Sequence, residues 1–303
     1  MFARLAHWHS TRRRRALAAA LLSALIALPG PLRAGAAAGV VGPRTFYLAL
    51  GDSLAYGYQP NLDVFHGYSH YLDADFETRG TRLTVNMACP GESTGTFIGG
   101  GCPYALLHKY PYLGSQLQAA LSFIGQHPGS VSPVTIDVGA NDLPLPHAAV
   151  ALSTAAPTAA MLQGAANDVF PLADALACAL PPSSTTAQVL ATFDANYTLI
   201  LSRLRTALHG TGDILTMNYY YPYQNQCPAF LPLVQLFNSH ILADAARFGV
   251  PVADVFSAFG GASTPNQNLC RLTWLCGFFL KDIHPNDTGY TVIAHAFESA
   301  AGY

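Results

Sequence analysis

The sequence predicts an α/β domain of the three-layer, doubly wound kind, with a parallel sheet of about five strands. Short apolar segments rich in β-forming residues alternate along the chain with segments of helical periodicity. Most of the short segments are apolar throughout, which is typical of parallel strands buried on both faces. No linker, charge block or internal repeat divides the chain after its N-terminal segment, so we expect a single domain.

The candidate strands are Thr45–Leu50, Arg82–Met87, Pro133–Val138, Ile214–Asn218 and Val250–Val255. Between them, apolar spacing predicts a helix capped by Ser115, one that ends at Gly210 and one that ends at Gly249. Asn286 or Thr288 is expected to cap a last helix. Two segments do not fit the minimal unit: 91–114 is expected to be a loop, and 143–188 to form helices and loops that act as a cap.

The N-terminal segment has the features of a secretory signal. A cluster of arginines precedes an apolar run of about a dozen residues, and small residues follow it. The run is too short for a membrane anchor, and Ala34-Gly35-Ala36 offers a cleavage site. We therefore expect a signal peptide over 1–36, a mature domain over 37–303 and a secreted protein. The paired arginines also permit twin-arginine export, so the route stays open.

Composition excludes several classes of protein. Hydrophobic residues make up 51% and charged residues 11%, which excludes a disordered chain. The net charge of −2 offers no basic face for nucleic acid, and nothing indicates an obligate oligomer, so we expect a monomer. Six cysteines in an exported chain indicate disulfides, and local loop closure favours pairing in chain order: Cys89–Cys102, Cys178–Cys227 and Cys270–Cys276. The other connectivities stay open.

Four polar motifs follow strands or precede the last helix. They are Gly51-Asp52-Ser53, "NMACPGEST", "VGANDL" and "KDIHPND". Each alone has an ordinary explanation as a turn or a helix start. In doubly wound sheets, however, ligands bind beyond the carboxyl ends of the strands, and these motifs are expected to meet there.

With these motifs the sequence resembles the GDSL family of serine esterases and lipases, also called SGNH hydrolases. "GDSL" stands letter for letter at 51–54, and "GAND" at 139–142 completes a specific combination. Together with "GSQLQAAL" at 114–121, the cysteines make the chain most similar to secreted bacterial members with three disulfides. The resemblance covers the mature chain and implies a flavodoxin-like fold without a cofactor.

The resemblance assigns roles to individual residues. Ser53 matches the nucleophile, and Gly51 and Gly57 allow the tight turn that exposes it. His284 matches the base that takes the Ser53 proton. The backbone N–H groups of Ser53 and Gly91 and the side-chain amide of Asn141 match the oxyanion hole.

The last motif departs from the family pattern. The family has an aspartate three residues before the histidine, where this chain has Lys281. Either the backbone carbonyl of Lys281 or the carboxylate of Asp282 can orient the imidazole, and we favour the carbonyl. His66, His70 and His295 are weaker candidates for the base. The spacing of His66 and His70 lacks the glutamate of a zinc protease motif, so no metal site is expected.

These features predict a secreted enzyme that cleaves small-molecule or lipid esters through an acyl-enzyme on Ser53 and contacts lipid surfaces transiently. The lipid preference depends on the family resemblance and on apolar segments. An acyltransferase or a carbohydrate O-acetylesterase of the same family is the alternative. A binding module without catalysis is the remote alternative, and it would need none of the four motif residues. Acyl-chain length and alcohol specificity are not predicted.

Overall fold

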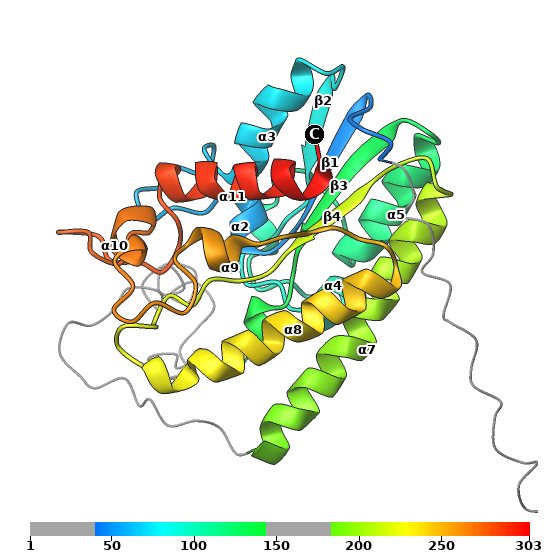
Figure 1. The fold of residues 1–303 in the computed structure, drawn as a ribbon. Helices are drawn as coiled ribbons and strands as arrows, with labels where there is room; N and C mark the ends of the chain where they lie inside the picture. The colour runs from blue at the N-terminus through cyan, green and yellow to red at the C-terminus, as the bar shows by residue number, and fades with distance from the viewer. Residues whose placement is uncertain (1–39, 144–182) are drawn as a thin grey trace, which may run out of the picture. The chain divides into compact units, whose positions relative to one another are not determined.

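The computed structural model describes residues 40–143 and 183–303. The expected signal peptide over 1–36 and most of the expected cap over 143–188 lie outside the described residues. One parallel sheet runs through the domain in the order β2-β1-β3-β4-β5, which is the flavodoxin-like order (Figure 1). The predicted fold class is therefore confirmed. Its strands are β1 (Phe46–Gly51), β2 (Leu83–Asn86), β3 (Val131–Asp137), β4 (Ile214–Met217) and β5 (Val252–Ala253).

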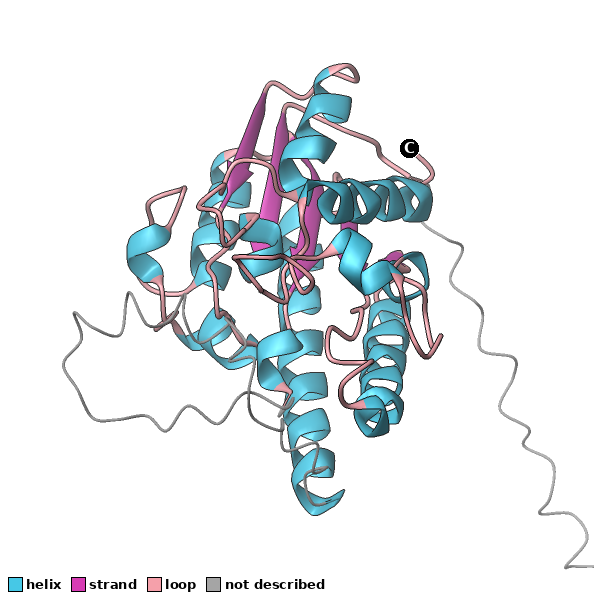
Figure 2. Cartoon of the chain, turned by 90° about the vertical axis from the view of Figure 1, so that its left-hand side faces the viewer, coloured by secondary structure: helices cyan, strands magenta, loops and turns pink. Residues whose placement is uncertain are grey.

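Helices cover both faces of this sheet (Figures 1 and 2). Helices α3 and α11 pack together on one face, and α5, α7 and α8 pack on the other. The elements are α2 (Ser53–Tyr56), α3 (Tyr68–Glu77), α4 (Thr94–Gly99), η1 (Ala105–Leu107), α5 (Gln116–Gln126), η2 (Ala140–Asp142), α7 (Ser183–Leu208), η3 (Pro228–Phe230), α8 (Leu231–Arg247), α9 (Val255–Ala258), α10 (Asn268–Leu272) and α11 (Asp287–Ala301).

Most predicted helix ends agree with the structure. The Ser115 hydroxyl caps α5, and Asn286, one of two candidates, caps α11 by accepting from the N–H of Gly289. Glycines with positive φ follow the last turns of α7 and α8 at Gly210 and Gly249. Helix α7 begins at Ser183, about three turns before its apolar segment, because its first turns are polar and exposed.

The segment 91–114 is not the plain loop that we expected. It contains α4, whose cap residue Ser93 shares reciprocal hydrogen bonds with Thr96 in a capping box. Two of the three expected disulfides are present, Cys89–Cys102 and Cys270–Cys276. The third involves Cys178, which lies outside the described residues.

The core lies between the sheet and its helices and is mostly aliphatic and aromatic. Strands β1 and β3 are adjacent in the sheet although β2 lies between them in the sequence, so the connections diverge from this pair. A crevice forms at such a switch point, beyond the carboxyl ends of the strands. Within 40–143 and 183–303, no helix is both long and apolar enough to cross a membrane.

Candidate active site

Ser53 lies in the turn that joins β1 to α2, at the carboxyl end of the sheet. Asp52 caps α2: its carboxylate accepts from the Leu54 N–H at 2.9 Å. Gly57 ends the same helix with φ +81°, and a Cβ there would lie 2.7 Å from the Cα of Gly67. The short helix is thus fixed at both ends, with the serine in its first position.

Gly51 permits the turn because another strand passes close behind it. Its φ is +136°, and a Cβ would lie 1.7 Å from Oδ1 of Asp137. Asp137 is the register partner of Gly51 on β3, and its carbonyl accepts from the Asp52 N–H at 3.0 Å. Only glycine fits between the turn that carries Ser53 and this buried carboxyl group.

Gln116 also supports the turn, a role that was not predicted from the sequence. Its side chain pairs with both polar backbone groups of Gly51: Oε1 accepts from N at 2.6 Å, and Nε2 donates to O at 3.0 Å. Nε2 also donates to Oε2 of Glu92 at 2.9 Å. A buried glutamine directly after the cap Ser115 was the available signal, but the sequence does not show what its amide contacts.

His284 lies against Ser53. Its Nε2 is 2.7 Å from Ser53 Oγ, a hydrogen bond between residues that are 231 positions apart in the chain. The histidine is buried, and the ring of Tyr58 lies edge-on to it with 4.7 Å between ring centroids. The contact brings the two ends of the domain together at the carboxyl edge of the sheet.

The side chain on the other ring nitrogen is Asp282. Its Oδ1 is 2.6 Å from Nδ1 of His284 and also accepts from the His284 backbone N–H at 2.7 Å. Our preference for the Lys281 carbonyl is therefore wrong, and the alternative that we kept, Asp282, takes its place. An aspartate that accepts from the backbone two residues later bends the chain, and this bend brings the ring to the same oxygen.

The segment that carries this pair is anchored through Trp274. The Trp274 N–H donates to the His284 carbonyl at 3.0 Å, and its own carbonyl accepts from the Asp282 N–H at 3.3 Å. Tyr220 also holds this segment, because its hydroxyl donates to the Ile283 carbonyl at 2.7 Å. These contacts fix the backbone on both sides of the histidine.

The structure also brings the other two motif residues to this edge. Asn141 follows β3, and its Nδ2 donates to the Glu92 carbonyl at 3.0 Å and lies 3.4 Å from Oδ2 of Asp52. Gly91, next to Glu92, has φ +77° in a turn that begins at Cys89. The Cys89 N–H donates to the Gly51 carbonyl at 3.1 Å, which ties this turn to the end of β1.

Two buried carboxyl groups lie beneath the serine. Burial raises the pKa of Asp52 to about 7. The hydrogen bond from the Leu54 N–H and the nearby His284 lower this pKa, and Glu92 raises it. Burial and the neighbouring Asp52 raise the pKa of Asp137 well above its usual range. Neither oxygen of the Asp137 carboxyl group has a hydrogen-bond partner in the described part of the chain. Both carboxyl groups therefore keep their protons to a higher pH than an exposed aspartate does.

The other histidines lie elsewhere. His66 pairs with Asp63 at 2.6 Å, its ring contacts that of His70, and His295 is exposed on α11. Within the described ranges, Asp63, His66 and Asp287 place ligand atoms close enough to hold an ion. The grouping of Cys89, Cys102 and His108 has its two sulfurs in a disulfide. The expected absence of a metal stays a prediction.

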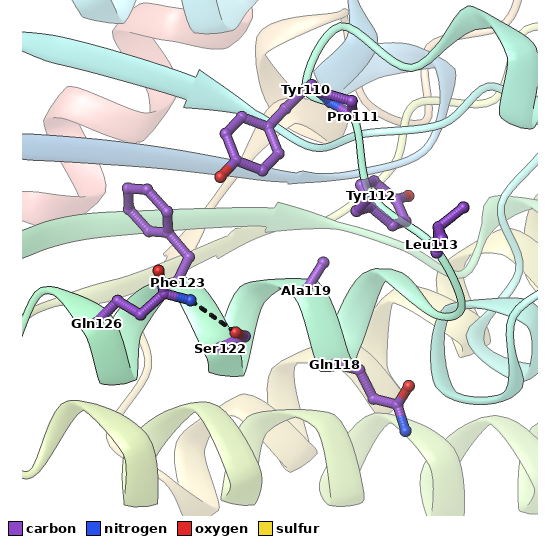
Figure 3. A pocket seen from close by; sticks show the side chains of 9 residues that line it. All are labelled: Tyr110, Pro111, Tyr112, Leu113, Gln118, Ala119, Ser122, Phe123 and Gln126. Atoms are coloured by element: carbon purple, nitrogen blue, oxygen red, sulfur yellow. Dashed lines mark hydrogen bonds between the residues drawn. The ribbon is translucent and has the colours of Figure 1, made fainter.

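A pocket of about 360 Å³ lies between α5 and the segment before it. Figure 3 shows Tyr110, Tyr112 and Phe123 facing it, with the amides of Gln118 and Gln126 at its ends. None of Ser53, His284 and Asn141 lines this pocket, so it is separate from the residues described above.

Comparison with known families agrees with this geometry. The profile of the GDSL-like Lipase/Acylhydrolase family matches residues 49–292, which is most of the chain. The chain belongs to this family. Members are esterases and acylhydrolases, and the matched range contains Ser53, Gly91, Asn141 and His284. No curated protein matches the chain.

Several solved structures have a fold similar to that of this GDSL-family chain. An acetylxylan esterase from Geobacillus stearothermophilus is 16% identical, with a TM-score of 0.50 over 87% of this chain and 97% of that one. An extracellular lipase from Streptomyces rimosus is 16% identical, and a phospholipase A1 from Streptomyces albidoflavus is 17% identical. Each of the two has a TM-score of 0.50 over 84% of this chain and 99% of its own.

Proposed function

We propose that this protein is a secreted serine hydrolase that cleaves carboxylic esters, with lipid esters as the preferred class, through an acyl-enzyme on Ser53. The observation that carries the proposal is the hydrogen-bonded series Ser53 Oγ, His284 Nε2, His284 Nδ1 and Asp282 Oδ1. A serine needs a base to attack an ester carbonyl, and a base needs a group that fixes its orientation.

In the first step His284 accepts the Ser53 proton while Oγ forms a bond to the ester carbonyl carbon. Collapse of the tetrahedral intermediate breaks the bond to the leaving alcohol, which receives the proton from Nε2. Water then adds to the acyl-enzyme with His284 again acting as base, and the acid leaves Ser53 free. Asp282 holds the ring and stabilises the imidazolium that forms in each half of the reaction.

The oxyanion that develops in both halves needs hydrogen-bond donors that are already in place. We assign this role to the backbone N–H groups of Ser53 and Gly91 and to the Asn141 amide. Support comes from the position of Asn141, whose Nδ2 donates to the Glu92 carbonyl at 3.0 Å and lies 3.4 Å from Oδ2 of Asp52. The oxyanion takes the place of Asp52, the longer of these two contacts. No cofactor takes part in this scheme.

The substrate class is the less constrained part of the proposal. Solved structures with the same fold include an acetylxylan esterase as well as a lipase and a phospholipase A1. Carbohydrate deacetylation and acyl transfer to another alcohol are therefore the alternatives, since all three reactions proceed through the same acyl-enzyme. A binding module without catalysis is disfavoured, because binding alone does not require the series from Ser53 to Asp282.

Hydrolysis of p-nitrophenyl esters from acetate to palmitate, by the native protein and by Ser53→Ala, tests the proposal. We expect hydrolysis by the native protein, loss of it in the variant, and a rate that favours longer acyl chains. Equal hydrolysis by the variant would contradict the assignment of Ser53. An added alcohol that captures most of the acyl group would point to the transferase, and a preference for acetyl-xylan would point to the deacetylase.

Export completes the proposal. We infer that residues 1–36 direct the chain out of the cell and that the mature protein is a monomer of the secreted type with three disulfides. The arginine cluster with its apolar run and the two disulfides that are present support this inference. The N-terminal sequence of protein recovered from the culture medium tests it, with Ala37 as the expected first residue.

A further inference from the structure

Exposed apolar side chains of the described residues gather on three loops near the proposed site. We define these as the nucleophile loop (58–67), the cysteine loop (100–114) and the histidine loop (273–286). The first follows the helix that begins at Ser53, the second follows Gly91, and the third contains His284. Of the thirteen large hydrophobic side chains that are exposed within 40–143 and 183–303, eight lie on these loops: Leu62, Phe65, Leu106, Leu107, Leu113, Phe278, Phe279 and Leu280.

Two polar contacts tie the three loops together. Lys109 on the cysteine loop donates to the carbonyls of Val64 and Tyr56, and its ammonium lies 4.5 Å from the centre of the Tyr56 ring. Gln59 on the nucleophile loop accepts from Nε1 of Trp274 at 3.0 Å, which connects it to the histidine loop. The apolar tips therefore stand on a common support that also holds the catalytic groups.

The tip of the histidine loop is the most exposed of these features. Phe278 is 88% exposed and Phe279 is 90% exposed, and the loop beyond α10 projects from the domain in Figure 1. Its base is closed by the Cys270–Cys276 disulfide and by the Gly277 N–H, which donates to the Trp274 carbonyl at 3.0 Å. Two aromatic rings are thus exposed to water on a turn that a disulfide and a hydrogen bond hold in place. Exposure of these rings to water is unfavourable in free energy.

We propose that these three loops bind the surface of a phospholipid bilayer or micelle, with Phe278 and Phe279 entering among the acyl chains. The tips stand on separate loops with polar backbone between them, and a fluid surface can admit each one separately. A protein partner would instead need one continuous complementary face. This inference rests on the proposed function, because it gives the lipid-ester hydrolase a way to reach aggregated substrate.

The charged residues on these loops are consistent with binding to a phospholipid surface. The chain has only two lysines, and both lie on these loops: Lys109 in the support and Lys281 directly after the apolar tip. No acidic residue lies between Cys276 and Lys281. A cation beside aromatic and aliphatic side chains suits the boundary between phosphate headgroups and acyl chains. The net charge of −2 gives no long-range attraction, so apolar insertion has to supply most of the affinity.

The test measures co-sedimentation of Ser53→Ala protein with phosphatidylcholine vesicles that contain a minor fraction of phosphatidylglycerol. The serine variant cannot consume the lipid, so binding is measured apart from hydrolysis. We expect vesicle binding, and we expect the added changes Phe278→Ser and Phe279→Ser to weaken it by about tenfold for each ring removed. The matched control is Leu236→Ser with Leu242→Ser, two exposed side chains on α8, which should bind like the parent.

Absence of sedimentation with vesicles, or equal loss in the control, would overturn the proposal. The first result is also expected if a protein partner or another part of this chain covers the tip. With Ser53 restored, the phenylalanine variants should hydrolyse dissolved p-nitrophenyl acetate at the native rate but lose activity on vesicles. If the protein bound vesicles but hydrolysed no ester, the proposed function would be wrong and the proposed lipid-binding surface would still stand.

Discussion

The two residues of the proposed catalytic pair, Ser53 and His284, are held in different ways. On the nucleophile side, Ser53 is fixed by buried polar side chains, since Gln116 pairs with Gly51 and Asp137 lies directly behind it. On the histidine side, His284 is fixed by backbone hydrogen bonds through Trp274 and by one carboxylate, in a segment with an exposed tip. Substitutions on the nucleophile side should therefore affect folding first, and those on the histidine side should affect catalysis first.

The largest effect is expected on the histidine side, from Asp282→Asn. An amide in place of the carboxylate can neither stabilise the imidazolium nor reliably select the reactive tautomer, so kcat should fall about 10³–10⁴-fold. The free energy of unfolding should change little by comparison. Steady-state kinetics with a soluble ester measures the first quantity, and urea denaturation measures the second.

Lys281→Ala is the matched control for that change. The Lys281 side chain takes no part in holding the ring, so activity on a soluble ester should stay near native. If Lys281→Ala and Asp282→Asn lowered kcat equally, the pairing of Asp282 with His284 would have no special role.

Gly51→Ala should have the largest effect on the nucleophile side. Its Cβ would lie 1.7 Å from Asp137 Oδ1 at φ +136°, so overpacking and backbone strain combine. The free energy of unfolding should fall by about 3–5 kcal/mol, with activity lost through unfolding. Gly129→Ala is the control, because Gly129 also has positive φ but has open space around it, and it should cost about 1 kcal/mol.

The sequence predicted the sheet well because its strands are apolar and its turns are marked by glycine. The predictions from the sequence were wrong or incomplete where a strand length or a side-chain contact depends on residues distant in the chain. β5 extends over two residues rather than six, because only Val252 and Ala253 pair with β4. The bend that brings Asp282 to His284 depends on one side-chain hydrogen bond, and Gln116 acts through a partner 65 positions away. Such contacts are decided by tertiary packing, which residue types alone do not show.

Asn141→Ala should lower kcat about 10²–10³-fold with little change in the free energy of unfolding. The reason is the loss of one donor to the oxyanion, while the surrounding turn keeps its backbone contacts. Asn196→Ala is a suitable comparison, because the Asn196 amide on α7 donates to the Thr94 hydroxyl on α4 at 3.0 Å. A similar loss in both variants would mean that Asn141 acts only through the structure of the edge.

The smallest effect is expected from Asp137→Asn, and it should depend on pH. Burial raises the folded-state pKa of Asp137, so the unfolded chain releases this proton at lower pH than the folded chain does. Stability is therefore lost as pH rises above about 4, and Asp52, with a pKa of about 7, adds to the loss up to neutrality. Near pH 8 the variant should be more stable than the native protein by about 1–3 kcal/mol.

Urea denaturation of both proteins near pH 4 and near pH 8 measures this difference. The advantage of Asp137→Asn should shrink at the lower pH, where the unfolded native chain is also protonated. A difference that does not vary with pH would show that packing, rather than ionisation, sets the cost of the buried carboxyl group.

Covalent labelling is the most direct test of whether Ser53 is a nucleophile that His284 activates. A fluorophosphonate reacts with an activated serine, loses fluoride and leaves a phosphonyl group that peptide mass spectrometry can locate. We expect one label per chain, on the peptide that contains Ser53, and at least a hundredfold slower labelling in His284→Ala. A label on another residue, or labelling of Ser53 that does not need His284, would contradict this mechanism.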